Sequence, residues 1–339
     1  MVETKRRGSL TLVFVRHGET VGNRDNIRQG QLDYPLTETG VTCAKCVGLA
    51  LKNVKWFQMW SSDLPRTLKT TSYLLEQRDV SNVVACSVGS GSVSLLDTCT
   101  RSQDINALQL PNGGIVQQTI LAREVFCGIR EGLSKDMTFE EARRKVAQDT
   151  SAVPETILDT SETIADVVSR QKLLLLGMIR NCYRNKDGQA VLTSTCTSLA
   201  TVTDSSSMIS AVSIETGVKT EAGLGLHFGN VLCVSHGLYM KIFLKEWCGL
   251  VLTNIKNCSI TRINVTWDIE TSSAAGDTGS GDNGNMDIDV GGVIPDSIVC
   301  TADSDYVNCT SHLPDQCFNT EQDVLEYTSK IDGERMYPF

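Results

Sequence analysis

The chain has 339 residues, 41% of them hydrophobic, and a formal net charge of −9. This length and apolar content suffice for one large folded domain or two smaller ones. The acidic balance argues against a general nucleic-acid or membrane-surface binder, because such proteins carry basic stripes, and it requires local cations to hold any anionic ligand.

Strand-like and helical segments alternate over the first eighty residues. The patterns predict a strand at 10–16, a loop at 18–35, a helix from Thr37, its N-cap, to Leu51, a strand near 56–60 and a helix near 64–77. This alternation is typical of a parallel sheet with helices on both faces.

Beyond residue 119 the same architecture is predicted to continue. We expect a helix near 138–148, a long helix from an N-cap at Ser161 to Arg184, a strand at 231–235, a helix near 238–249, a strand near 258–267 and an edge strand within 293–300. Polar or glycine-rich stretches separate these elements, and we interpret them as insertions near 79–118, 185–228 and 271–292. The expected fold is a three-layer α/β/α sandwich with a mainly parallel central sheet, forming a single domain over 9–310 with a C-terminal tail at 311–339.

Two of the predicted strands end in a histidine followed by glycine. The first apolar run stops at Arg16-His17-Gly18, and a later one stops at His236-Gly237. A third run is followed by Pro65 and Arg66, where the proline suits the first turn of a helix. Because α/β proteins bind ligands at the carboxyl ends of their strands, these three ends could form one pocket with two arginines and two histidines.

These residue types suit phosphoryl transfer. The neutral imidazole of His17 can attack phosphorus to give a phosphohistidine, which divides hydrolysis into two displacements. Arg16 and Arg66 are permanently charged donors for the phosphoryl oxygens, and His236 adds a further donor. A lone histidine at a strand end is more often a structural residue, so the hypothesis depends on these residues occurring together.

The chain resembles the histidine phosphatase superfamily, also called the phosphoglycerate mutase-like superfamily, through these residues in this order. Within it, the similarity is greatest to TIGAR-type fructose-2,6-bisphosphatases. The motifs that carry it are Arg16-His17-Gly18-Glu19-Thr20, Ile27-Arg28-Gln29-Gly30-Gln31, Pro35-Leu36-Thr37-Glu38-Thr39-Gly40, Ser61-Ser62-Asp63-Leu64 and Val234-Ser235-His236-Gly237-Leu238-Tyr239-Met240. The resemblance covers roughly residues 10–78, 119–184 and 229–310.

The resemblance implies a general acid in the segment 123–132. Glu124 there looks like the superfamily's acid, which protonates the leaving oxygen and then activates water. Glu131 is the competing candidate, although its place in the motif suits an orienting role. Glu162 matches a further family segment at the start of the long helix.

The resemblance also implies a substrate-binding loop after the first histidine. In the family the equivalent loop contacts the phosphate or sugar, which indicates Asn23, Gln29 and Gly30, together with Gly237 beside the second histidine. A plain turn explains the loop residues equally well, so both interpretations stay open at this point.

The implied activity is that of a metal-independent phosphatase without a cofactor. Its substrate is expected to be a small phosphorylated sugar or glycerate, foremost the 2-phosphate of fructose 2,6-bisphosphate, whose removal lowers glycolytic flux. One alternative is a cofactor-dependent phosphoglycerate mutase or a broad-specificity small-molecule phosphatase. Another is a catalytically silent scaffold. The presence of all five candidate catalytic residues argues against it, because a scaffold has no chemical need for them. The sequence does not identify protein partners.

The cysteines and the N-terminal region bear on location. The first apolar run has about six residues, too few for a signal-peptide core or a membrane span. The 13 cysteines are scattered and odd in number, unlike a secreted disulfide framework. We therefore expect reduced thiols, a cytoplasmic location and no glycosylation at the sequons of Asn257, Asn264 and Asn308. The isolated pair Cys43 and Cys46 lacks a partner pair at zinc spacing, so no metal site is predicted.

Overall fold

The computed structural model describes residues 5–76, 105–109, 115–183, 218–219, 225–270, 295 and 297–313. Its centre is an eight-stranded sheet in the order β3-β4-β2-β6-β1-β7-β8, with β5 paired to β6. The strands are β1 (Lys5–Arg16), β2 (Trp56–Ser62), β3 (Ile105–Gln109), β4 (Ile115–Thr119), β5 (Val218–Lys219), β6 (Gly225–Ser235), β7 (Ile260–Glu270) and β8 (Ser297–Ala302).

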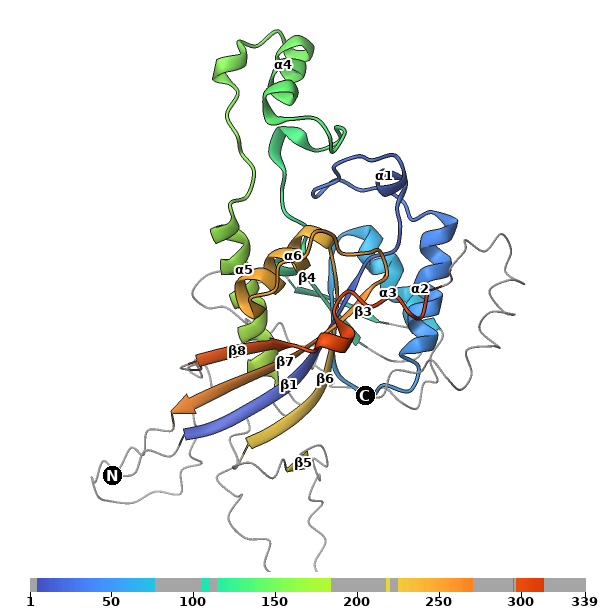
Figure 1. Ribbon diagram of the computed structural model, residues 1–339, viewed down its shortest axis with the longest axis vertical. Coiled ribbons are helices and arrows are strands. Elements are labelled where there is room, and N and C mark those ends of the chain that lie inside the picture. The colour runs from blue at the N-terminus through green and yellow to red at the C-terminus, as the bar shows by residue number, and fades with distance from the viewer. Residues whose placement is uncertain are drawn as a thin grey trace, which may run out of the picture.

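Helices cover both faces of the sheet, as Figure 1 shows. On one face lie α2 (Glu38–Ala50) and α3 (Pro65–Glu76), and on the other lie α5 (Ile164–Asn181) and α6 (Gly237–Cys248). The helices α1 (Val21–Arg24) and α4 (Phe139–Thr150) lie beyond the sheet. Strand β1 alternates its side chains between two cores: Leu12 and Phe14 pack with α5 and α6, whereas Val13 and Val15 pack with α2. The predicted three-layer α/β/α sandwich is therefore confirmed.

Strand direction is mixed, with the parallel part at the centre. Strands β4, β2, β6 and β1 run parallel. Strands β3, β5 and β7 pair with them antiparallel, and β8 pairs antiparallel with β7. The register places Arg16 opposite Ser235 and Val234 opposite Ser61. The carboxyl ends of β1, β2 and β6 therefore lie side by side at one edge of the sheet.

Two helix N-termini test the predicted caps. Thr37 caps α2, because its hydroxyl accepts a hydrogen bond from Gly40 N at 3.0 Å, as predicted. The prediction of Ser161 as the cap of α5 is wrong. Thr163 caps that helix in a reciprocal pair with Asp166, since the side chain of Asp166 can return the hydrogen bond. The hydroxyl of Ser161 instead donates to Asp159.

The boundaries of two predicted insertions need correction. The stretch 79–118 contains β3 and most of β4, which pairs in parallel with β2, and the stretch 185–228 contains β5 and the beginning of β6. Short apolar pieces within these stretches become strands because they extend an existing sheet. The remainder of both stretches, the insertion at 271–292 and the tail from 314 lie outside the described residues. The edge strand expected within 293–300 is β8, which pairs with β7.

A buried histidine near the end of the described chain makes stability depend on pH. His312 is fully buried, its Nε2 lies 2.9 Å from the carbonyl oxygen of Cys258, and burial lowers its pKa to about 4. The unfolded chain takes up a proton at His312 below pH 6.5 and the folded chain does not, so stability falls as the pH falls from 6.5 towards 4. We expect wild type to lose about 2 kcal/mol more than His312→Gln between pH 7 and pH 5. Urea unfolding at both pH values measures this difference, and parallel losses in the two proteins would contradict it.

Candidate active site

The two histidines predicted at strand ends lie together. The ring centroids of His17 and His236 are 5.2 Å apart, and the two residues are 2% and 0% exposed. The amide of His17 donates to the carbonyl of Ser235 at 3.0 Å, which continues the pairing of β1 with β6. Adjacent parallel strands thus bring residues more than two hundred positions apart into one site.

The ring of His17 has the protonation state of a nucleophile. Its Nδ1 lies 2.7 Å from the carbonyl oxygen of Gly18, and because a carbonyl only accepts, Nδ1 carries the proton and Nε2 keeps its lone pair. Burial holds the pKa of His17 well below its usual value, and the charges of Arg66 and Arg16 lower it further. The imidazole is therefore neutral at physiological pH.

His236 is also neutral, but both of its ring nitrogens have protein partners. Arg66 Nε donates to Nδ1 at 3.3 Å, so the proton lies on Nε2, which donates to the Ser62 hydroxyl at 2.9 Å. Burial, followed by the charge of Arg66, lowers the pKa of His236 well below its usual value. To bind a phosphoryl oxygen through Nε2, His236 must exchange the Ser62 hydroxyl for it.

The two predicted arginines are arranged differently. Arg16 donates from Nη1 to the carbonyl of Ile255, and its buried Nε has no partner among the described residues. Arg66 donates from Nη1 to Leu32 O at 2.7 Å and from Nη2 to Gly30 O at 2.6 Å. Arg16 thus offers an unused donor inside the site, whereas Arg66 also anchors the loop after His17.

Two of the predicted loop residues shape the loop. Gly30 has φ +53°, and a Cβ there would lie 1.8 Å from Oε1 of Glu131, so only glycine fits. That carboxylate oxygen accepts from the amides of Gln31 and Cys127 at 2.9 and 3.0 Å, which is the orienting arrangement considered for Glu131. Gln29 Oε1 accepts from the hydroxyl of Thr20 at 2.9 Å and braces the loop.

Asn23 faces the site with a defined amide orientation. Its Oδ1 accepts from the amide of Thr20 and from Nδ2 of Asn257, so its own NH₂ group is available to a ligand. Asn257 also donates to the carbonyl of His17 at 2.9 Å. The sequence drew attention to Asn257 only as a sequon. The sequence alone does not show that β7 runs antiparallel to β1. This strand direction is what brings the residues before β7 beside His17.

Glu124 lies at the N-terminus of α6. Its Oε1 accepts from the amide of Tyr239 at 3.0 Å and its Oε2 from that of Leu238 at 3.2 Å. The N-cap of α6, His236, makes no side-chain capping bond, so Glu124 supplies the cap from another segment. Gly237 begins this helix, and a Cβ there would lie 2.9 Å from Arg16 Nε.

The carboxylate of Glu124 lies near enough to Arg16 and Arg66 for their charges to interact. Burial lowers the pKa of Arg16 and of Arg66, and the negative charge of Glu124 opposes this shift in both. Lys135, which the sequence analysis did not identify, adds a cation. Its pKa is lowered by burial and then by Arg16 and Arg28, and its charge lowers the pKa of His17. As one basic residue among 31, Lys135 carried no distinguishing signal.

Within the described ranges, no group of three or more His, Cys, Asp or Glu side chains is placed to hold a metal ion. In the same part of the chain, no helix has the length and apolar character needed to cross a bilayer.

Comparison with known proteins relates the N-terminal part of the chain to one family. Residues 12–86 match the model of the histidine phosphatase superfamily, branch 1. Fructose-2,6-bisphosphatase TIGAR of Bos taurus is 49% identical over 67 residues, which are 20% of this chain and 25% of that protein. The 2,3-bisphosphoglycerate-dependent phosphoglycerate mutase of Methanococcus vannielii is 41% identical over 73 residues, 22% of this chain and 31% of that protein. These alignments thus span about a quarter to a third of the curated relatives.

Solved structures also match over a larger share of the chain. A phosphoglycerate mutase from Bacillus anthracis has 19% identity and a TM-score of 0.43, covering 76% of this chain and 88% of that one. A mycobacterial glucosyl-3-phosphoglycerate phosphatase has 19% identity and a TM-score of 0.43, covering 75% and 90%. The family model over residues 12–86 and the curated homologues confirm the resemblance to the histidine phosphatase superfamily seen in the sequence.

Proposed function

We propose that the protein is a metal-independent phosphatase that forms a phosphohistidine on His17 and hydrolyses the 2-phosphate of fructose 2,6-bisphosphate. The observation that carries the proposal is the neutral imidazole of His17, with Nε2 unprotonated, lying 5.2 Å from His236 between the centroids. A nucleophile in this state attacks phosphorus without first losing a proton. Removal of this phosphate would lower glycolytic flux.

The proposed reaction has two balanced steps. In the first, His17 Nε2 bonds to phosphorus, the bond from phosphorus to the sugar oxygen breaks, and Glu124 gives that oxygen a proton. In the second, water bonds to phosphorus as Glu124 takes its proton, and the bond to His17 breaks. Arg16 Nε and the Asn23 amide are the donors available for the phosphoryl oxygens.

The cations around the pocket support a substrate with a second anionic group. Lys135 lies near enough to both Arg16 and Arg28 for their charges to interact, and Arg28 donates to the carbonyl of Lys135 at 2.8 Å. Three clustered cations exceed what a single phosphate needs. The similarity to TIGAR proteins over 67 residues supports a bisphosphate in particular.

The same proposal places the protein in the cytoplasm, without nucleic-acid or membrane partners. Cys46, Cys233 and Cys258 are buried free thiols, which suits a reducing compartment.

A substrate panel tests the proposed function. Purified protein is incubated with fructose 2,6-bisphosphate, 2,3-bisphosphoglycerate and the monophosphoglycerates in the presence of EDTA, while free phosphate and isomer interconversion are both followed. Phosphate release foremost from the sugar bisphosphate is the expected result. Interconversion without release would favour the mutase, whose homologues match over a similar length, and absence of turnover with every ester would favour a silent scaffold.

A further inference from the structure

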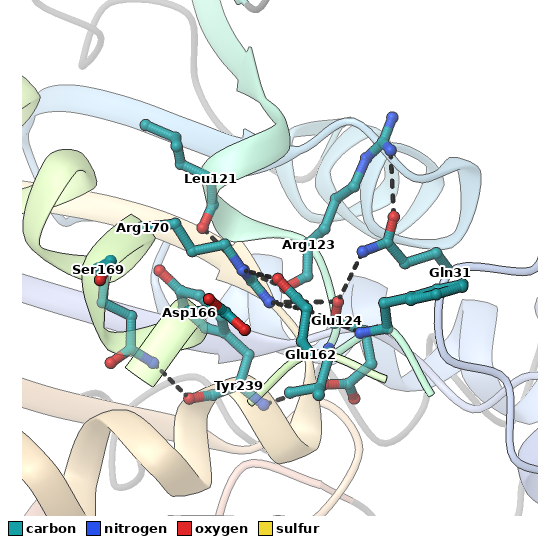
Figure 2. Close-up of polar contacts among 12 residues, drawn as sticks. Gln31, Leu121, Arg123, Glu124, Glu162, Asp166, Ser169, Arg170 and Tyr239 are labelled. Carbon is teal, nitrogen blue, oxygen red and sulfur yellow. Dashed lines mark hydrogen bonds and ion pairs between the residues drawn. The ribbon is translucent and has the colours of Figure 1, made fainter. Parts of the chain in front are cut away.

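Arg170 on α5 holds the backbone of the segment that carries Glu124. Its Nη1 donates to the carbonyls of Leu121 and Arg123 at 3.0 and 2.7 Å, and its Nη2 donates to the carbonyl of Glu124 at 3.3 Å. Figure 2 shows the guanidinium directed at this segment. One planar group therefore fixes three carbonyl groups within four residues.

Glu162 completes the attachment from the other side. Its carboxylate pairs with Arg170 through two bonds, Nε to Oε1 at 2.8 Å and Nη2 to Oε2 at 3.0 Å, with side chains only 12% and 21% exposed. Oε2 also accepts from the amide of Phe126 at 2.8 Å, and the amide of Glu162 donates back to the carbonyl of Phe126. The segment is thus held both at Glu124 and two residues beyond it.

Arg170 also contacts the residue that holds the carboxylate of Glu124. Its guanidinium carbon lies 4.9 Å from the ring centroid of Tyr239, in the geometry of a cation–π contact. The amide of Tyr239 is a donor to Glu124 Oε1. Arg170 therefore braces both ends of Glu124, the backbone directly and the carboxyl group through α6.

We propose that Arg170, oriented and neutralised by Glu162, is a positioning residue for proton transfer by Glu124. This inference rests on the proposed function, in which Glu124 protonates the leaving oxygen and then activates water. None of the hydrogen bonds described for Arg170 reaches His17 or a donor available to phosphate. A displacement of about 1 Å in a catalytic group can cost about 100-fold in rate, so loosening this brace should slow proton transfer and leave nucleophilic attack intact.

Leaving-group dependence separates these two steps. The test compares fructose 2,6-bisphosphate, whose alkoxide must be protonated, with 2,4-dinitrophenyl phosphate, whose phenolate departs without a proton. The variants are Arg170→Lys, which keeps the charge but loses the planar fork, and Glu162→Gln. Lys172→Gln is the matched control, because Lys172 lies on the same helix with an exposed side chain.

For both variants we expect kcat/KM for the sugar bisphosphate to fall about 100-fold, while kcat/KM for the aryl ester stays within a factor of a few. With the aryl ester kcat should still fall and phosphoenzyme should accumulate, since the water step also needs Glu124. The double variant should be little worse than either single one, because residues that act as a unit are not additive. The control should match wild type throughout.

Each result is decisive for one of the two proposals. Retained kcat/KM for the aryl ester itself shows that the variants are folded. If the variants lost kcat/KM equally with the two esters, or kept wild-type kinetics with both, the positioning role of Arg170 would be overturned. Absence of any phosphoenzyme in wild type with the aryl ester would instead overturn the proposed function.

Discussion

Replacing His17 with alanine is expected to abolish the phosphoenzyme and to reduce turnover by about 10⁴-fold or more. The neighbouring His236 is not placed to replace it, because both of its ring nitrogens already have partners in Arg66 and Ser62. The measurement is rapid quenching with a ³²P-labelled substrate, followed by denaturing gel analysis at alkaline and acidic pH. Wild type should show label that is stable to base and lost in acid.

The matched control for this experiment is His227→Gln. His227 lies on the same strand, β6, near its opposite end, and its Nδ1 is 3.1 Å from the hydroxyl of Ser9. This variant should keep both the label and the rate. If His17→Ala retained either full turnover or acid-labile label, the assignment of the nucleophile would be wrong.

The sequence predicted the centre of the fold and the meeting of the two histidines for a simple reason. Buried parallel strands such as β1 and β6 are continuous apolar runs that end where the ligand site begins. The polar residues Arg16, His17 and His236 directly after these runs are therefore predicted to lie in the site. The register confirms this, with Arg16 opposite Ser235. Such information is local and can be recognised without knowing the remainder of the fold.

Features that depend on long-range pairing were not predictable in the same way. Strands β3 and β4 are short apolar pieces within polar stretches, and they form because β2 offers an edge. Asn257 and Arg170 act through partners far away in the chain, and nothing in their neighbours distinguishes them. Glu162 was noticed from its motif, whereas its partner Arg170, eight residues later on α5, became visible only when the fold placed both beside the segment of Glu124.

Replacing Glu124 with glutamine is expected to lower kcat/KM for fructose 2,6-bisphosphate by about 10²–10⁴-fold, because the leaving oxygen then departs without a proton. The loss should be small for 2,4-dinitrophenyl phosphate. The amide retains one oxygen for Tyr239 N but presents NH₂ to Leu238 N, so the cap of α6 is weakened and stability should fall by about 1 kcal/mol. Steady-state kinetics and urea unfolding measure the two effects separately.

Glu131→Gln distinguishes the two candidate acids within one segment. Glu131 spends one carboxylate oxygen on the amides of Gln31 and Cys127 and packs against Gly30, so its loss should disturb the substrate loop and raise KM for both esters alike. A strong leaving-group dependence in Glu131→Gln, together with its absence in Glu124→Gln, would transfer the acid role to Glu131. The geometry favours Glu124, because its carboxylate meets the helix that begins at His236 and acts on the charges of both Arg16 and Arg66, whereas the carboxylate of Glu131 is held by the loop.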